Sequence, residues 1–536
     1  MDLQEQKEAS SEPFTSPKEE KKSRKKPIII SIFVILLIAA VSFGVLWYLK
    51  NTQTKSTTKD ESSKEIKHLT IATLDGPMNA FFPDDNEIYP SAYYFVVNNQ
   101  LAESLVHYEG VTKLVPALAA SWKNPDENTW VFNLKKDVKF HTGRTMTADD
   151  VVYSINKAKE NENFDIYTST ISSVKALSKY EVEIKTDKPD AVILNKLSLL
   201  SIVDSKGNYN TVTGGTGPYI IKPGTKPSED KIDLVAFDDY HGGKPMTRQL
   251  SFFVVDSEEA AYNAVKSGKA NIGGDLSGGA IVSKLDKSSD KIIKIVNGSV
   301  TYLSINTVRP DSPLQKKEVR QAVRLAFNID KLLKDSGIDA TIASQIVPQE
   351  IPGYNPDVKV PKQDIKKAKQ LLADAGYPNG FTINFTHTKS GNEELSKSIV
   401  SQLAQIGVKV EEVELPSDNF DEYYKLIIGG KTDLAILGYS SDTYDAFDVY
   451  DGAFRQDGIY TSPQLDEYMG EAESTFDVKK RLKVLQDIAA YVDEDTPVIP
   501  LFFRSFYWIT DNADYVLPRD ISNQGLGVYY WKAHLK

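Results

Sequence analysis

The sequence predicts an α/β body with a largely open sheet, preceded by one N-terminal membrane anchor. Three observations predict this arrangement: an uncharged apolar run at 27–49, a short polar stretch after it, and alternating strand-like and helix-like segments through the rest of the 536 residues. At roughly 100 to 200 residues per domain, this length indicates several structural units. The formal net charge of −11 would repel phosphate backbones, so no nucleic-acid partner is expected.

The apolar run at 27–49 is long enough to cross a bilayer. Its residues from Ile28 onward, at about 1.5 Å each, reach roughly 33 Å, against a hydrocarbon core of about 30 Å. Basic residues crowd positions 21–26, which predicts a cytoplasmic tail at 1–26 and an extracellular body. A cleavable signal peptide is the alternative, but its apolar region would be shorter, about 7 to 15 residues, and would end at small residues rather than at Leu46–Lys50.

The polar stretch at 50–66 is rich in Ser, Thr and Lys and predicts a flexible linker. The chain has no cysteine, which excludes disulfides, Cys nucleophiles and the lipid-modified cysteine of bacterial lipoproteins. The expected location is therefore the cell membrane, by a single protein span, with the body on a Gram-positive type of surface.

The first half of the body begins with a predicted hairpin around the turn at 124–128, in which Trp130, Phe132 and Leu134 share one buried face. A helix is predicted from Ala148, because Thr147 and Asp150 resemble a capping box before an apolar helical repeat. A strand at 250–255 and a helix at 258–267, which ends at Gly268, follow.

Strands and helices alternate more regularly after position 360. Gly and Pro residues punctuate the helical patterns, and the apolar runs between them have strand lengths. The predicted helices are 364–375, 393–406 and 419–428, and the predicted strands are 381–387, 408–415 and 433–437. Such alternation indicates an α/β layer, in which ligands bind beyond the carboxyl ends of strands.

The segment 438–451 follows a predicted strand and interleaves aromatic rings with carboxylates. This composition suits a ligand that carries an ammonium group and apolar surface. A solvated acidic loop, whose rings close the edge of the domain, is the alternative on composition alone.

Enzyme motifs are absent from the sequence: there is no HExxH, no GxSxG and no complete GxxxxGK[ST] phosphate loop. The six histidines do not fall at helical ligand spacing, and Asp445, Asp448 and Asp451 are three residues apart, unlike a calcium loop. Gly214–Pro218 predicts a tight turn into a strand. No enzyme activity, cofactor or metal is therefore expected.

Several stretches, in order along the chain, resemble the bacterial extracellular solute-binding proteins of family 5, the oligopeptide-, dipeptide- and nickel-binding type. The resemblance extends from about residue 68 to the C-terminus. It rests on Leu114–Ala119, Trp130–Leu134, Val138–Gly143, Thr147–Ser154, Gly215–Tyr219, Gly242–Pro245, Ile305–Thr307, Val319–Ala322, Ala373–Pro378 and Pro497–Leu501.

The resemblance implies a two-lobed periplasmic-binding-protein-like fold of type II with an extra subdomain, its lobes joined by two crossing strands. Lobe I is expected at 67–108, 211–306 and 500–536, the extra subdomain at 109–210, and lobe II at 307–499. It also implies a monomeric substrate-binding protein of an ABC importer, whose partners are a peptide ligand, two permease subunits and two ATPase subunits.

In peptide-binding relatives, an aromatic residue followed three positions later by an aspartate receives the ligand's α-ammonium. Gly438–Asp442 matches this pattern, so Tyr439, Asp442 and the adjacent Tyr444 are candidate substrate-binding residues. Phe81 and Phe82 are further candidates, because the motif around 79–83 departs from the family pattern near residues that line the cleft in relatives. Nickel chelates or oligosaccharides remain possible ligands, and a surface peptide sensor or chaperone and, last, a surface hydrolase remain alternative functions.

Overall fold

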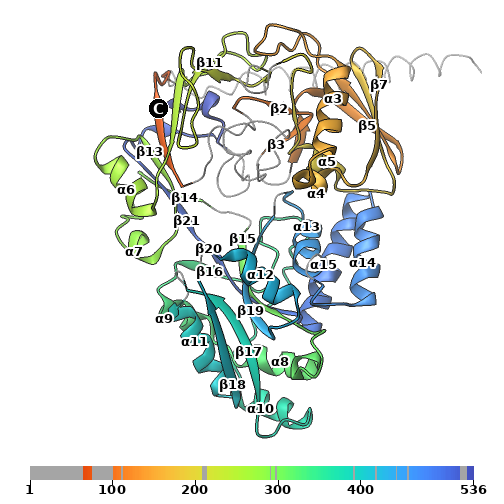
Figure 1. The fold of residues 1–536 in the computed structure, drawn as a ribbon, viewed down its shortest axis with the longest axis vertical. Coiled ribbons are helices and arrows are strands. Elements are labelled where there is room, and N and C mark those ends of the chain that lie inside the picture. The colour runs from red at the N-terminus through yellow and green to blue at the C-terminus, as the bar shows by residue number, and fades with distance from the viewer. Residues whose placement is uncertain are drawn as a thin grey trace, which may run out of the picture. The chain divides into compact units, whose positions relative to one another are not determined.

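Strands of three main sheets form the framework of the described chain, and helices pack against them (Figure 1). The computed structural model describes residues 64–74, 100–109, 113–207, 214–289, 291–295, 299–389, 393–416, 419–441, 443–455, 458–518 and 528–536. The predicted tail (1–26) and the predicted anchor (27–49) lie outside these residues. Within the described ranges, no helix has the length and apolar character that crossing a membrane requires.

The predicted linker at 50–66 also lies mostly outside the described residues, but its last residues are paired. Lys64 forms an antiparallel bridge with Leu535, and Ile66 forms a parallel bridge with Thr247. The structured body therefore begins before residue 67.

A seven-stranded mixed sheet combines segments from the beginning, the middle and the end of the described chain. Its central strand β1 (Leu69–Thr73) pairs in parallel with β12 (Gln249–Val254) and β13 (Ile272–Leu276). Apolar residues on one face of this sheet pack against α6 (Glu258–Lys266) and α7 (Gly279–Val282). The remaining strands are β10 (Tyr219–Ile221), β11 (Lys231–Ala236), β21 (Phe506–Thr510) and β14 (Ile292–Ile295).

A six-stranded mixed sheet has the order β16-β20-β15-β19-β17-β18. Apolar side chains cover both of its faces, so its inner strands β15, β19 and β20 carry buried runs, whereas the edge strands β16 and β18 are mostly half-buried or exposed. Its strands are β15 (Ser299–Ile305), β16 (Ala340–Ile342), β17 (Phe381–Thr388), β18 (Val408–Leu415), β19 (Leu434–Ser440) and β20 (Val498–Arg504).

The helices around this sheet fall into two groups. One core joins the sheet to α8 (Lys317–Leu325), α9 (Ile329–Ser336), α10 (Ile365–Asp374) and α11 (Glu393–Ala404). A second core joins it to α13 (Ala446–Tyr450), α14 (Pro463–Ser474) and α15 (Val478–Asp495). A smaller cluster holds α12 (Phe420–Ile428).

A four-stranded antiparallel sheet with α3 (Ala148–Lys159) forms a third core. The order of its strands is β5-β6-β8-β7. They are β5 (Ala119–Asp126), β6 (Thr129–Leu134), β7 (Ile171–Ser178) and β8 (Glu181–Thr186). Short helices η1 (Glu162–Phe164), α4 (Asp165–Thr168) and α5 (Ile193–Leu197) lie in the same segment.

Short elements complete the described chain. Three two-stranded ladders pair β2 (Glu103–Ser104) with β9 (Ser201–Ile202), β3 (Val106–Glu109) with β4 (Lys113–Pro116), and β22 (Tyr515–Val516) with β23 (His534–Leu535). The short helices are η3 (Pro313–Gln315), η4 (Asp451–Arg455) and η6 (Tyr530–Lys532).

The chain passes between the seven-stranded and six-stranded sheets at two places. β14 in the first sheet precedes β15 in the second, and β20 continues into β21 through the single residue Ser505. The predicted lobe boundaries at 306/307 and 499/500 stay predictions; in terms of strand pairing, β15 and β20 both belong to the six-stranded sheet.

The glycine-rich turn before β10 is a site of close backbone contact. A Cβ atom at Gly215 would lie 1.8 Å from the carbonyl oxygen of Leu101, and one at Gly217 would lie 2.4 Å from that of Gln100. Only glycine fits at these positions. The prediction of a tight turn into a strand is confirmed, because Gly214–Pro218 leads directly into β10.

His141 lies against this turn and is half-buried. Its Nε2 is 2.9 Å from the carbonyl oxygen of Gly217, which can only accept, so Nε2 carries the proton. Its Nδ1 is buried and has no hydrogen-bond partner. Burial lowers the pKa of His141 to about 4, because a second proton would be placed on an unsolvated nitrogen.

We expect His141 to make the folded state less stable at acidic pH. The unfolded chain binds the proton at the ordinary pKa of about 6.5, so stability falls as the pH drops from about 6.5 to about 4, by at most about 3 kcal/mol. Urea unfolding of the wild type and of His141→Gln at pH 8 and pH 4.5 measures this. The variant should show the smaller loss between the two pH values, and equal losses would contradict the assignment.

Candidate binding site

The predicted binding segment, 438–451, extends from the end of β19 through the following loop and α13. Asp445 caps the first turn of α13, where its side chain accepts a hydrogen bond from the backbone N–H of Phe447 at 2.9 Å. Tyr439 and Tyr444 are described, whereas Asp442, Phe81 and Phe82 lie outside the described residues.

Asp448, in the first turn of α13, ties together the residues on both sides of position 442. Its carboxylate accepts hydrogen bonds from the Tyr439 hydroxyl at 2.9 Å, from Ser441 Oγ at 2.9 Å and from the backbone N–H of Thr443 at 3.2 Å. Burial nevertheless raises the pKa of Asp448, because desolvation outweighs these three donors. The Asp448 side chain thus fixes Ser441 and the backbone N–H of Thr443, on the two sides of position 442.

The ring of Tyr439 lies directly over Gly452. A Cβ atom at position 452 would be 2.0 Å from Cε2 of that ring, closer than atoms can approach. Gly452 belongs to η4, a single π-helical turn of the kind that is frequent at functional sites. The position of the Tyr439 ring therefore depends on glycine at 452 and on the hydrogen bond to Asp448.

Tyr444 is held in the core in a rare backbone conformation. Its φ is 51°, in the left-handed region, and only 3% of the residue is exposed. Its ring meets that of Tyr108 edge to face at 5.5 Å. The role of Tyr444 as a substrate contact stays a prediction; in this conformation its ring packs within the protein.

Two residues from distant segments hold the neighbouring peptide bond. The Tyr108 hydroxyl donates to the carbonyl oxygen of Thr443, and Asn195 Nδ2 donates to the same oxygen at 3.0 Å and to the Tyr108 hydroxyl oxygen at 2.6 Å. Tyr108 comes from β3 and Asn195 from α5. The strained turn at Tyr444 is therefore stabilised from outside the loop.

A buried ion pair fixes the other end of the loop. Arg481 of α15 makes two parallel hydrogen bonds to Asp445, with N–O distances of 2.6 and 2.8 Å, and donates through Nε to the carbonyl oxygen of Ala472 at 2.8 Å. Among the described carboxylates of the segment 438–451, Asp445 and Asp448 both bind its backbone, and neither role was predicted. The Asp445-x-x-Asp448 spacing is typical of a helix start and could have indicated that Asp445 caps α13. No local signal points to Arg481.

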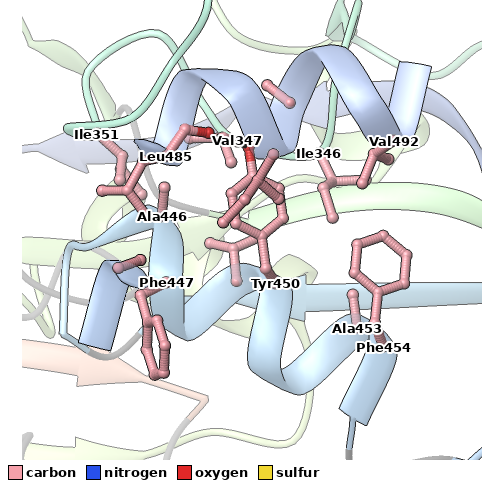
Figure 2. Packing of buried hydrophobic residues seen from close by; sticks show 14 of the residues in the cluster. Ile346, Val347, Ile351, Ala446, Phe447, Tyr450, Ala453, Phe454, Leu485 and Val492 are labelled. Carbon is pink, nitrogen blue, oxygen red and sulfur yellow. Dashed lines mark hydrogen bonds between the residues drawn. The ribbon is translucent and has the colours of Figure 1, made fainter. Parts of the chain in front are cut away.

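Apolar packing anchors α13 and η4 below the loop. Figure 2 shows Ala446, Tyr450 and Phe454 among residues of α15 and the segment 346–351. The Tyr450 hydroxyl donates to the carbonyl oxygen of Leu485 at 3.4 Å. The rigid side of the binding segment is thus a packed helix pair rather than a free loop.

A cavity of about 440 Å³ opens beside this segment. Residues 443–455 form one wall, and residues of α4, α5 and their neighbours form the other. The three cations in its lining form ion pairs: Lys188 with Glu473 at 2.8 Å, Lys196 with Asp190 at 2.7 Å, and Arg455 with Asp451 at 3.1 Å. Thr443 also lines it, next to the Asp448 carboxylate. Such a cavity can accept a polar side chain of a ligand.

Metal binding finds no support in the described part of the chain, where no group of three or more His, Asp or Glu side chains could hold an ion. The described residues at 439–455 offer aromatic rings, a fixed backbone and carboxylates, which can bind a solute.

The sequence profile of the bacterial extracellular solute-binding proteins, family 5 (middle), matches residues 113–461, more than half of the chain. The chain belongs to this family. Members of the family are solute-binding proteins, so the protein is a binding protein and not an enzyme, as the absence of catalytic motifs predicted.

Characterised members of the family are distant relatives. The dipeptide-binding protein of Escherichia coli is 25% identical over 452 residues, which cover 75% of this chain and 82% of that protein. The nickel-binding protein NikA of Staphylococcus aureus is 28% identical over 417 residues, which cover 74% and 82%. The structure of HbpA2 from Haemophilus parasuis aligns with a TM-score of 0.77 at 22% identity, over 88% of this chain and all of that one. This likeness shows a two-lobed α/β fold of the periplasmic-binding-protein type.

Proposed function

We propose that the protein is the peptide receptor of an ABC importer, held at the outer face of the cell membrane by residues 27–49. The observation that carries this proposal is the fixed segment around position 442. Asp448 holds Tyr439, Ser441 and Thr443 at once, so the described residues on both sides of position 442 are fixed, which supports a ligand contact at that position. The dipeptide-binding relative adds support.

Closure of the two lobes over the ligand is the proposed mechanism. An extended peptide would pair its backbone with strand edges, while cavities such as the one beside Thr443 accept varied side chains. A ligand shifts the open and closed populations only if it binds the closed state better, which requires contacts to both lobes. The two crossings between the sheets give the hinge for such a motion.

The N-terminal anchor would keep the receptor close to its permease. A tethered receptor meets its partner at a high effective concentration, so delivery need not rely on diffusion in an open exterior. The partners in this proposal are permease and ATPase subunits on the same membrane.

Identification of bound solutes tests the proposal most directly. We expect mass spectrometry of the full-length protein, purified in mild detergent and then denatured, to release peptides of a few residues. Release of nickel chelates instead would favour the activity named for the staphylococcal relative. Peptides bound by a protein whose deletion leaves peptide uptake unchanged would favour a surface sensor or chaperone.

A further inference from the structure

Arg504 lies at a crossing between the two large sheets. It is the last residue of β20, directly before Ser505, where the chain crosses from the six-stranded to the seven-stranded sheet. Its backbone pairs with Ala340 of β16. The side chain is half-buried, and this burial lowers the pKa of the guanidinium because desolvation disfavours the charged form.

No carboxylate neutralises Arg504 among the described residues. Every other described arginine holds a carboxylate in an ion pair; these are Arg144, Arg248, Arg309, Arg320, Arg324, Arg455 and Arg481. The acid that acts most on Arg504 is Glu258, whose carboxylate already accepts from the backbone N–H of Gly278 at 2.7 Å and from Ser277 Oγ at 3.1 Å. A partly desolvated cation without an anion is costly, so a missing partner is indicated.

Arg504 lines a cavity of about 150 Å³ together with Lys294, a second cation. Lys294 lies on β14, and Asp339, an acid on which its charge acts, is engaged by Lys287 and by the Tyr507 hydroxyl. Thr341 and Ser344 supply hydroxyl donors to the same lining, with Glu350 at its exposed rim. Hydrogen-bond donors and positive charges are the main polar groups in the lining of this cavity.

The cavity is built from both sheets. Lys294 belongs to the seven-stranded sheet, whereas Thr341 and Arg504 belong to the six-stranded sheet. An anion bound here would contact groups on both sides of the two crossings. Its binding would therefore depend on the angle between the lobes, which is the condition for a ligand to drive closure.

We infer that this cavity binds a carboxylate group of the transported solute, with Arg504 as the principal contact. Arginine presents a planar fork of donors that matches a carboxylate. The inference rests on the proposed function for the source of the carboxylate, the free C-terminus of a peptide. A small free carboxylate would offer the same chemistry.

Acetate tests the site without reference to any peptide. At constant ionic strength, replacement of chloride by 100 mM acetate should raise the melting temperature of the full-length protein in detergent by about 1–2 °C more than that of Arg504→Gln. Lys479→Gln, which removes an exposed cation of α15, should respond like the wild type. Equal shifts in the wild type and Arg504→Gln would overturn the site.

Trialanine and its C-terminal amide then identify the source of the carboxylate. By calorimetry, the acid should bind the wild type about 30-fold more tightly than the amide, and Arg504→Gln should lose this difference. Equal affinities of acid and amide for the wild type would overturn the peptide-terminus assignment and leave peptide binding intact. An acetate effect that needs Arg504, with neither peptide bound, would support the anion site and reject the proposed peptide function. Arg504→Lys keeps the charge but not the planar pair of donors. Its preference for the acid over the amide should lie between those of the wild type and Arg504→Gln.

Discussion

Replacement of Arg481 by alanine is expected to lower the free energy of unfolding by about 3–5 kcal/mol, because it leaves Asp445 as an unpaired buried carboxylate. Asp445 is 4% exposed and has no other cation beside it that forms an ion pair within the described residues. The lost bond from Arg481 Nε to Ala472 adds to the effect. Urea unfolding followed by far-UV circular dichroism measures the difference.

Two companion variants separate the buried charge from a general effect on α15. Lys483→Ala removes an exposed ion pair with Asp487 on the same helix and should change stability by less than about 1 kcal/mol. The double variant Asp445→Ala/Arg481→Ala should be more stable than Arg481→Ala alone, because no charge is left unpaired. If Arg481→Ala and Lys483→Ala lower the free energy of unfolding by the same amount, the argument from burial is wrong.

Asp442→Ala is expected to weaken peptide binding by about 2–5 kcal/mol, some 30-fold or more, if its carboxylate receives the ligand's ammonium group. The position is predicted from the sequence, and the support comes from its neighbours, since Ser441 and Thr443 are both bound to Asp448. Stability should hardly change. Calorimetric titration with trialanine compares the variant and the wild type.

Acetylation of the peptide's amino group provides the matching chemical control. The acetylated peptide should bind the wild type as weakly as free trialanine binds Asp442→Ala, and the variant should not distinguish the two peptides. Asp421→Ala, an exposed acid in α12, should behave like the wild type. Full affinity in Asp442→Ala would show that the ammonium group is bound elsewhere.

Most regular elements could be predicted from local patterns. The helix from Ala148 is confirmed, with the capping box between Thr147 and Asp150, and the helix predicted at 364–375 is α10, capped by Asp364. The strands predicted at 381–387 and 408–415 are β17 and β18, a parallel pair. Periodicity and end signals act over a few residues, so they survive without knowledge of the tertiary contacts.

The face of β6 was predicted only in part. Phe132 and Leu134 are buried as expected, but Val131, expected on the opposite face, is buried too. On that face Val131 lies between its cross-strand partners, Lys123 of β5 and Glu183 of β8, whose long side chains can cover it. The alternation of residues along one strand cannot reveal which side chains of neighbouring strands cover its second face.

The residues that hold the candidate site in place could not be predicted from local sequence patterns. Arg481 lies 36 residues from Asp445, Asn195 lies 248 residues from Thr443, and Tyr108 lies 335 residues from it. The sequence indicated the rings and carboxylates of the segment 438–451 but not which of them hold the segment in place. Charge count alone did not single out Arg504 either, because its isolation depends on where the other acids are engaged.

Two side chains from far upstream donate hydrogen bonds to the carbonyl oxygen of Thr443, and this has a consequence for protein engineering. A stretch exchanged between members of this family would arrive without Tyr108 and Asn195 and would have to adopt the unusual turn at Tyr444 on its own. A graft meant to change the bound solute should therefore move three pieces together: the candidate binding segment, Tyr108 and Asn195.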